Sequence, residues 1–481
     1  MSRIFAATLT CLALGGCMVG PDYRRPAVET PQSWRFAEKE AKEPADTAWW
    51  EQFNDPVLNN LIAVALRENK DLKIAAARVE EFRGRYAVAR APLFPQIGAG
   101  VSPGVERTTG RGQTPLPAGT PNPTELYQAN FFASWEIDLW GKLRRVTEAA
   151  RADLIGSEEG KRAVILSLIT SVAGAYVNLR DLDRQLEITE RTAKSREESH
   201  NIFILRFQAG YVSDLELSQA RSEYERALAT IPAIEKAIAQ QEDALSLLLG
   251  RNPAAIGRGK AIDALEAPAV PAGLPSDLLE RRPDIRQAEQ GLIAANAQIG
   301  AARAQFFPSI SLTGLFGWES MRLSQLFTGP ARMWNWAAPI TQPIFTGGAI
   351  SAEVKAAEAF REEALLQYQK AIQNAFRDME DSLIDHRRTR EQLDAQARQV
   401  EALRTYASTA RLRYDNGYTS YIEVLDAERS LFDAELAQAQ TKGGLLQALI
   451  NIYKALGGGW VVSAEKMTMP AGAGDHIPLN P

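Results

Sequence analysis

An internal duplication constrains the fold of this chain more than any other feature. The stretch RFQAGYVSDLEL at residues 206–217 is nearly repeated as RYDNGYTSYIEV at residues 413–424. The residues that recur, each 207 positions later, are Arg206, Gly210, Tyr211, Ser213 and Glu216, which correspond to Arg413, Gly417, Tyr418, Ser420 and Glu423. Residues 141–250 align with 348–457 at the same offset, and 69–97 align with 282–310 at an offset of 213. Solenoids repeat units of about 20–50 residues, so two copies this long predict two-fold pseudosymmetry within one domain.

Changes in composition suggest the boundaries of the segments. We expect a signal peptide at 1–16, a lipidated extended segment at 17–47, a first repeat at 48–250, a Pro- and Gly-rich linker at 251–277, a second repeat at 278–457 and a flexible tail at 458–481. Within the repeats we expect β-hairpins at about 94–140 and 307–346 and helical turns near 210 and 417.

The N-terminus, MSRIFAATLTCLALGGC, has the pattern of an export signal: Arg3, an apolar stretch and small residues. It ends in Leu-Gly-Gly-Cys, which resembles a bacterial lipobox and makes Cys17 the expected lipid attachment site. The alternative is a plain signal peptide in which Cys17 is incidental. After cleavage the mature chain keeps one cysteine, so it folds without an intramolecular disulfide.

Each copy contains a helix that is too long for a compact domain. Residues 141–208 and 348–415 lack proline and are rich in good helix formers. A helix of this length measures about 100 Å at 1.5 Å per residue. In the second copy the spacing of a coiled-coil seam is followed by Met379, Leu383, His386, Arg390, Leu393, Ala397 and Val400. The long helices must therefore pack against one another.

The duplicated turn joins two helices in each copy. Gly210 and Gly417 stand where a helix should end, because glycine takes the left-handed conformation without steric cost. Ser213 with Glu216, and Ser420 with Glu423, have the spacing of capping boxes that begin the next helix. Each copy is thus predicted to form a helical hairpin with a tight reversal.

Strands precede each long helix. In 127–140 apolar residues alternate with polar ones, and Phe132 is the exception. The same period of two occurs at 96–102, at 309–318 and around 333–341. Strands of about ten residues with aromatic ends are typical of membrane barrels, although a soluble sandwich gives a similar pattern.

Four strands are too few for a membrane barrel, whose smallest members have eight. An open sheet edge cannot face lipid, because its backbone groups would lack hydrogen-bond partners. Copies of the chain must therefore complete the sheet, and two, three or four copies give eight, twelve or sixteen strands.

Other functional classes find little support. The net charge is −5 and no basic cluster is present, which disfavours nucleic acid as a partner. The three histidines, His200, His386 and His476, are isolated and lack metal-ligand spacing, and no phosphate loop or nucleophile elbow occurs. We expect neither enzymatic activity nor a cofactor nor a bound metal.

The combined motifs resemble the TolC-like outer-membrane efflux family, in its lipoprotein branch. They are CMVGPDYRRP, WWEQFNDPVLNNLIAVALRENKDLKIAAARVEE, RAPLFPQI with RAQFFPSI, LWGK with TGGAISAEVKAAEA, and the two GYxSxxE turns. The resemblance implies a mainly α fold with membrane β-strands, a trimer with a twelve-stranded outer-membrane barrel, and a long periplasmic α-barrel. It also implies a periplasmic adaptor and an inner-membrane pump of the resistance–nodulation–division (RND) type as partners.

The resemblance further implies that the hairpin turns form a closed periplasmic tip. Tyr414 matches the family's tip tyrosine, and Glu423 and Asp426 match acidic positions that face the lumen. This chain has Thr419 where the commoner pattern has an arginine, and Arg413 and Arg206 are candidate substitutes. Glu216 is the equivalent of Glu423 in the first copy.

Passive export of small organic compounds is the function expected from this resemblance. Seven Met and three His show no clustered lining, which argues against metal ions as cargo. The alternatives are a duct for type I protein secretion, metal-ion efflux, or a non-conducting lipid-anchored scaffold.

Overall fold

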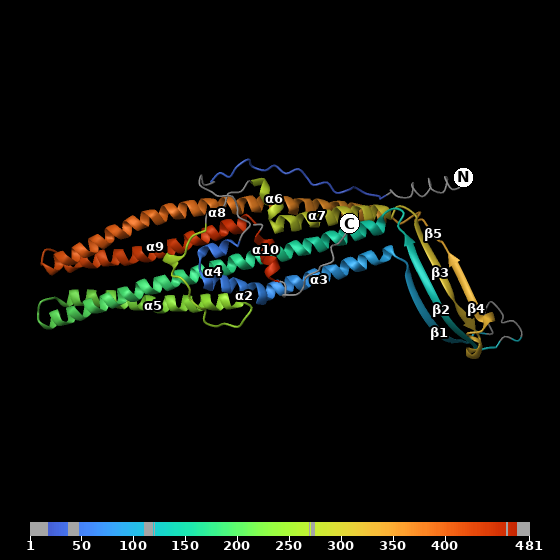
Figure 1. Ribbon diagram of the computed structural model, residues 1–481, viewed down its shortest axis with the longest axis horizontal. Coiled ribbons are helices and arrows are strands. Elements are labelled where there is room, and N and C mark those ends of the chain that lie inside the picture. Colours follow the sequence, from blue (N-terminus) through green and yellow to red (C-terminus); the bar gives the residue numbers. More distant parts are fainter. Residues whose placement is uncertain are drawn as a thin grey trace. The chain divides into compact units, whose positions relative to one another are not determined.

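The computed structural model describes residues 18–36, 48–109, 119, 121–268, 270, 275–457 and 460–468 (Figure 1). Cys17 and the predicted signal peptide lie outside the described residues. The chain divides into two compact units, and each takes residues from both copies of the repeat. The sheet unit comprises Met1–Ala27, Arg78–Ser157 and Gln287–Tyr368, and the helical unit comprises Val28–Ala77, Glu158–Arg286 and Gln369–Pro481.

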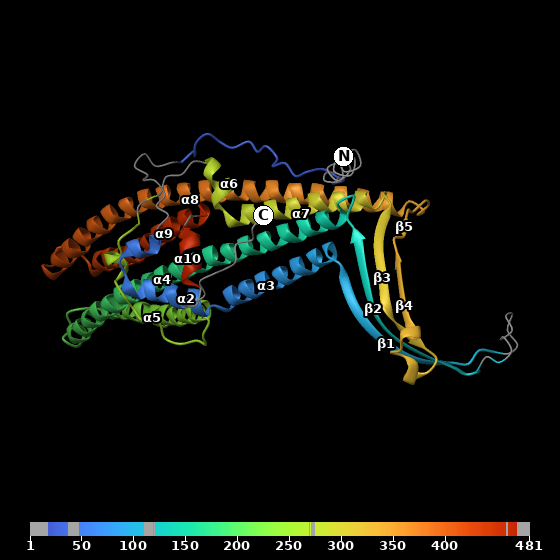
Figure 2. The same cartoon turned by 45° about the vertical axis from the view of Figure 1, so that its right-hand side comes forward.

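The sheet unit contains one antiparallel sheet, whose strands lie side by side in Figure 2. Its strands are β1 (Gln96–Glu106), β2 (Thr124–Ile137), β3 (Ser309–Ser320), β4 (Arg332–Ala337) and the short β5 (Ile340–Thr341). The order is β1-β2-β3-β4, and β5 pairs with β3 where β4 has ended. Pro339 interrupts the last strand, since proline has no N–H for the ladder. Within the described residues, β1 and β4 each pair on one side only, so both edges of the sheet are open.

The strand register confirms the predicted alternation. Ala99 pairs with Phe131, Phe131 with Phe316, and Phe316 with Trp334, so one face carries an apolar row across all four long strands. These large side chains are exposed: Phe131 is 53% and Trp334 is 68% accessible. Phe132, the exception, points to the opposite face, where its ring covers Gly98 and leaves no room for a Cβ.

An N-terminal strap, residues 18–27, is held to the rest of the sheet unit by ion pairs in which one partner is buried. The guanidinium of Arg145, whose side chain is only 2% exposed, donates to Asp22 at 2.7 Å. Further along the strap, Arg25 donates to both carboxylate oxygens of Glu289, at 2.7 and 2.5 Å. These contacts tie the first residues after the predicted lipid site to helices of both copies.

The helices repeat in the same order in both copies. They are α2 (Pro56–Glu68), α3 (Lys70–Arg90), α4 (Lys142–Gln208), α5 (Asp214–Leu248), α6 (Leu278–Arg281), α7 (Pro283–Ala304), α8 (Ala349–Asp415), α9 (Tyr421–Ala455) and α10 (Trp460–Met467). The 3-10 turns are η1 (Trp49–Phe53), η2 (Ala91–Leu93), η3 (Ile262–Ala264), η4 (Pro275–Asp277), η5 (Leu323–Gln325) and η6 (Gly329–Ala331). Two continuous helices of 67 residues, α4 and α8, confirm the predicted long helices.

The core of the helical unit is built around stacked aromatic rings. Trp49 stacks on Tyr453 with ring centroids 5.0 Å apart, and Trp460 meets Trp49 edge-on at 6.1 Å. An 18-residue window of α4 is apolar enough for a membrane span, but 61% of it is buried in this packing. The core helices therefore account for that apolar stretch.

The prediction of a flexible tail from residue 458 is wrong for α10. Trp460 and Val461 are buried at 1% and 2% exposure, and the Glu465 carboxylate accepts hydrogen bonds from Lys161 and Arg162 at 3.0 Å. Glycine composition suggested a loose end, but burial of an apolar face outweighs it. Residues 469–481 lie outside the described part of the chain.

The predicted seam of α8 is only partly buried. Met379, Leu383, His386 and Val400 are at most 7% exposed. Arg390 and Ala397 are exposed and Leu393 is half-buried, so the middle of the seam faces a groove instead of a packed helix.

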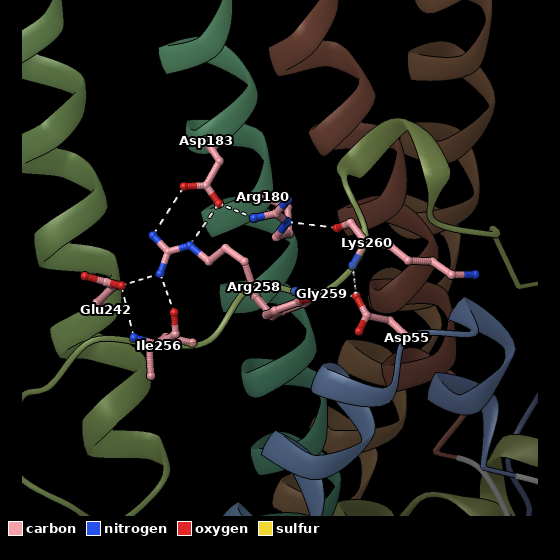
Figure 3. A network of polar contacts seen from close by, with 9 residues as sticks. Asp55, Arg180, Asp183, Glu242, Ile256, Arg258, Gly259 and Lys260 are labelled. Carbon is pink, nitrogen blue, oxygen red and sulfur yellow. Dashed lines mark hydrogen bonds and ion pairs between the residues drawn. The ribbon is translucent and has the colours of Figure 1, made fainter.

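The segment between the repeats is fixed by a buried carboxylate, shown in Figure 3. Asp55 is fully buried, caps α2 by accepting from Val57 N–H at 2.9 Å, and accepts from the backbone N–H of Lys260 at 2.9 Å. The hydroxyl of Tyr176 also donates to it, at 2.8 Å. Gly259 is required here because a Cβ would overlap the Asp55 carboxylate.

Arg258 joins the same segment to both helices of the first hairpin (Figure 3). It donates to Asp183 on α4 at 3.1 Å and forms an ion pair with Glu242 on α5. Glu242 also accepts from the backbone N–H of Ile256 at 3.0 Å. The segment predicted as a linker is thus held by charge-assisted contacts.

Candidate functional site

The two hairpin turns have the same backbone geometry. Gly210 and Gly417 have φ of 75° and 76°, the left-handed region that favours glycine. The next residue, Tyr211 or Tyr418, donates its N–H to the carbonyl of Arg206 or Arg413 at 2.8 Å. The expected glycine C-caps are confirmed at both positions.

The caps that follow differ between the copies. At the start of α5, Ser213 Oγ accepts from Glu216 N–H at 3.4 Å and the Glu216 carboxylate accepts from Ser213 N–H at 2.9 Å, which completes a capping box. At the start of α9, Ser420 makes no side-chain cap bond. The predicted second capping box is therefore wrong.

One substitution between the copies explains the difference. Where the first copy has Val212, which packs on apolar neighbours, the second has Thr419, whose hydroxyl donates to the Glu423 carboxylate. Arg413 also donates to Glu423, at 3.4 Å. Thr419, in the turn, and Arg413, at the end of α8, thus hold the Glu423 carboxylate away from the backbone N–H of Ser420.

Tyr414 lies in an aromatic cluster between the two hairpins. Its ring stacks on Phe203 of α4 at 6.2 Å and packs against Tyr421 of α9 at 5.3 Å. The Arg206 guanidinium lies 5.8 Å from the ring centroid, and Arg206 also pairs with Asp415 at 3.8 Å. Burial raises the pKa of the Tyr414 hydroxyl, and the nearby Arg206 opposes this shift.

Asp426 is exposed on α9 and has a partner on α8. It accepts a hydrogen bond from the Tyr406 hydroxyl at 3.4 Å. Partial desolvation, together with the charges of Asp426 and Glu423, raises the pKa of Tyr406. Asp426 follows Glu423 by three residues, so the two carboxylates lie on one face of α9.

An ion network between the hairpins, centred on the buried pair of Glu223 and Arg196, was not predicted. Glu223 of α5 pairs with Arg196 of α4 at 3.2 Å and with Arg429 of α9. Arg226 and Asp433 also pair, at 3.2 Å, and these two residues occupy equivalent positions of the two copies. The sequence does place these opposite charges at equivalent positions of the repeat, so it contained a signal for this ion pair.

Comparison with known proteins assigns the family. A family model described as "Outer membrane efflux protein" matches residues 61–251 and 274–458. The chain belongs to the outer membrane efflux protein family. The two matched ranges, one in each copy of the repeat, cover most of the chain.

Named relatives match this efflux protein over nearly their full length. The probable efflux pump outer membrane protein TtgC of Pseudomonas putida is 37% identical over 95% of this chain and 96% of its own. The cation efflux system protein CusC of Escherichia coli is 36% identical over 93% and 97%. The solved outer-membrane channel OprN is 31% identical, with a TM-score of 0.87 over 92% of this chain and 100% of that one.

The predicted fold class and localisation follow from these matches. The protein is an outer-membrane efflux channel with long periplasmic helices, and proteins of this kind work with pump partners.

Proposed function

We propose that three copies of the chain form a channel with a twelve-stranded outer-membrane barrel. The sheet, with its four long strands and the short β5, carries the proposal, because its apolar face is exposed and both its edges are open among the described residues. Open edges cannot face lipid, so neighbouring copies must pair with β1 and β4. The mass of the detergent-solubilised assembly tests the copy number: two or four chains would reject the trimer.

The channel passes solutes delivered by an inner-membrane RND pump through a periplasmic adaptor. It is anchored by a lipid on Cys17, which lies outside the described residues. Replacement of Cys17 by serine should abolish acylation while trimers still assemble. Incorporation of labelled palmitate into the variant would contradict this assignment.

The tip holds the channel closed at rest. Tyr414 joins α4 to α9, while Thr419 in the turn and Arg413 at the end of α8 hold the Glu423 carboxylate. Tyr414→Phe combined with Thr419→Ala should raise single-channel conductance in planar bilayers. Wild-type conductance would remove these residues from the latch.

Asp426 and Glu423 line the constriction, where three-fold symmetry would place six carboxylates. Such rings favour cations. Asp426→Asn should lower cation preference and weaken block by divalent cations, whereas Asp214→Asn, an exposed acid at the start of α5, should not. Equal ion selectivity in the two variants would exclude Asp426 from the lumen.

The cargo is proposed to be small organic compounds. TtgC is named for an efflux pump, and CusC for a cation efflux system, so metal-ion export is the second candidate. Deletion of the gene should sensitise the host to antibiotics or solvents more than to copper or silver salts. The reverse order of sensitivity would favour metal ions.

A further inference from the structure

The sheet has an outer end that lies away from the helices (Figure 2). α3 and α7 end just before β1 and β3, and α4 and α8 begin just after β2 and β5, so all four helices adjoin the same end of the sheet. The connection between β3 and β4, residues 321–331, lies at the opposite end and is here called the outer turn. Because the long helices are periplasmic, the outer turn faces the cell exterior.

The outer turn exposes large apolar side chains. Met321, Leu323 and Phe327 are between 58% and 71% accessible. Leu326, by contrast, is buried and anchors the turn. The Phe327 ring meets the Trp318 ring edge-on, with centroids 5.6 Å apart. A cluster of exposed apolar side chains marks a contact with another apolar surface.

The outer turn continues the apolar face of the sheet. Trp318 follows Phe316 by two residues and pairs with Arg332, so both Trp318 and Arg332 lie on the face that carries the apolar row. The opposite face is polar at this end, where Gln128 donates to Glu319 at 2.6 Å. The proposed barrel therefore turns Trp318 and Arg332 towards lipid, and tryptophan is enriched at the boundary between membrane and water.

Two guanidinium groups at this boundary are unpaired. Arg322 in the outer turn and Arg332 at the start of β4 are exposed, and their side chains form no hydrogen bond or ion pair with any residue that the structure describes. Glu125, an acid on the same face, lies on β2, two strands and thus at least about 10 Å from Arg332. Its carboxylate accepts a hydrogen bond from the Tyr127 hydroxyl at 3.1 Å. The two positive charges therefore lack a counter-charge within the described part of the chain.

A phosphate-bearing lipid matches both features of the outer turn. Such a lipid offers acyl chains to apolar side chains, and its phosphate groups lie at the level of the membrane surface. A guanidinium binds phosphate through paired, charge-assisted hydrogen bonds. Two unpaired guanidinium groups next to apolar side chains therefore fit a lipid with an anionic headgroup better than a zwitterionic one.

We propose that the outer turn binds an anionic, phosphate-bearing lipid of the outer leaflet. Arg322 and Arg332 bind its phosphate groups, and Met321, Leu323 and Phe327 contact its acyl chains. The inference rests on the proposed function in taking the sheet as part of a membrane barrel. It adds a lipid-binding site and the chemical class of its ligand.

Binding of lipid A, a glycolipid with two phosphate groups, to the assembled full-length channel tests the site. Native mass spectrometry of the detergent-solubilised protein should show tighter binding of lipid A than of zwitterionic phosphatidylethanolamine. Arg322→Gln combined with Arg332→Gln should weaken lipid A binding about thirtyfold, because each cation at an anionic lipid surface contributes about fivefold. Equal affinities of the wild type for the two lipids would overturn the proposal.

A matched control removes the same charge elsewhere in the sheet unit. Arg78→Gln combined with Arg151→Gln changes two exposed arginines on α3 and α4, away from the outer turn. This double variant should bind lipid A like the wild type. An equal loss of affinity in both double variants would show that net charge, and not the outer turn, attracts the lipid.

The apolar side chains distinguish a lipid from a free phosphate ion. Leu323→Ser combined with Phe327→Ser should also weaken lipid A binding, because the contacts with the acyl chains are lost. Unchanged affinity of this variant would reject a lipid as the occupant in favour of an anion alone.

Single-channel conductance separates this inference from the proposed function. The variant with both Arg322→Gln and Arg332→Gln should conduct like the wild type, because Arg332 lies on the face that points away from the lumen. A wild type that does not conduct would contradict the proposed channel. A wild type that conducts but does not prefer lipid A would contradict only the lipid site.

Discussion

The two helix starts at the tip should respond differently to the same substitution. Ser213→Ala removes the hydroxyl that accepts from Glu216 N–H, whereas Ser420→Ala removes a hydroxyl that makes no cap bond. Loss of an N-cap side chain costs about 1 kcal/mol. Since 1.4 kcal/mol is a factor of ten, local opening of the first turn of α5 should become about fivefold more frequent.

Hydrogen–deuterium exchange of the detergent-solubilised protein measures this opening. Peptides that cover the start of α5 should exchange about fivefold faster in Ser213→Ala, and those at the start of α9 should change little in Ser420→Ala. Thr419→Val should then release Glu423 to cap α9 and slow exchange there, because the equivalent Val212 accompanies an intact capping box. Equal acceleration in the two serine variants would refute the assignment of different caps.

Three further perturbations test contacts within the sheet unit and within the helical unit. Asp55→Ala should lower the free energy of unfolding by on the order of 3–5 kcal/mol, because it leaves buried donors without an acceptor. Thermal unfolding should show a large drop in melting temperature for this variant but not for the exposed control Asp263→Asn. Equal melting temperatures of the two variants would contradict the prediction. Glu289→Gln removes the charge that pairs with Arg25, so limited proteolysis should cut the strap faster, and an unchanged rate would show that the ion pair does not hold it. Burial favours the neutral form of Glu465, but hydrogen bonds from Arg162 and Lys161 outweigh it and hold the pKa of Glu465 below 4.5. The packing of α10 should therefore be intact at neutral pH and should loosen as the pH falls below about 4.5. Trp460 fluorescence that stays constant down to pH 3 would contradict this.

The sequence by itself determined the elements and their repetition. Helix propensity, the absence of proline over 141–208 and 348–415, and glycine at 210 and 417 act locally, so they gave the long helices and their turns. The period of two in the strands likewise predicted which side chains share a face, and the observed register agrees.

Only the tertiary structure decided which polar side chains meet. Glu423 and Glu216 have the same local motif, yet the packing of Thr419 and Arg413 draws one carboxylate away from its cap. The pair between Glu223 and Arg429 and the burial of Trp460 join residues from different helices, which no local pattern specifies. Helices and strands follow from interactions between near neighbours in the chain, whereas a hydrogen bond or ion pair between side chains of different helices forms only where the packing brings donor and acceptor within about 3–4 Å.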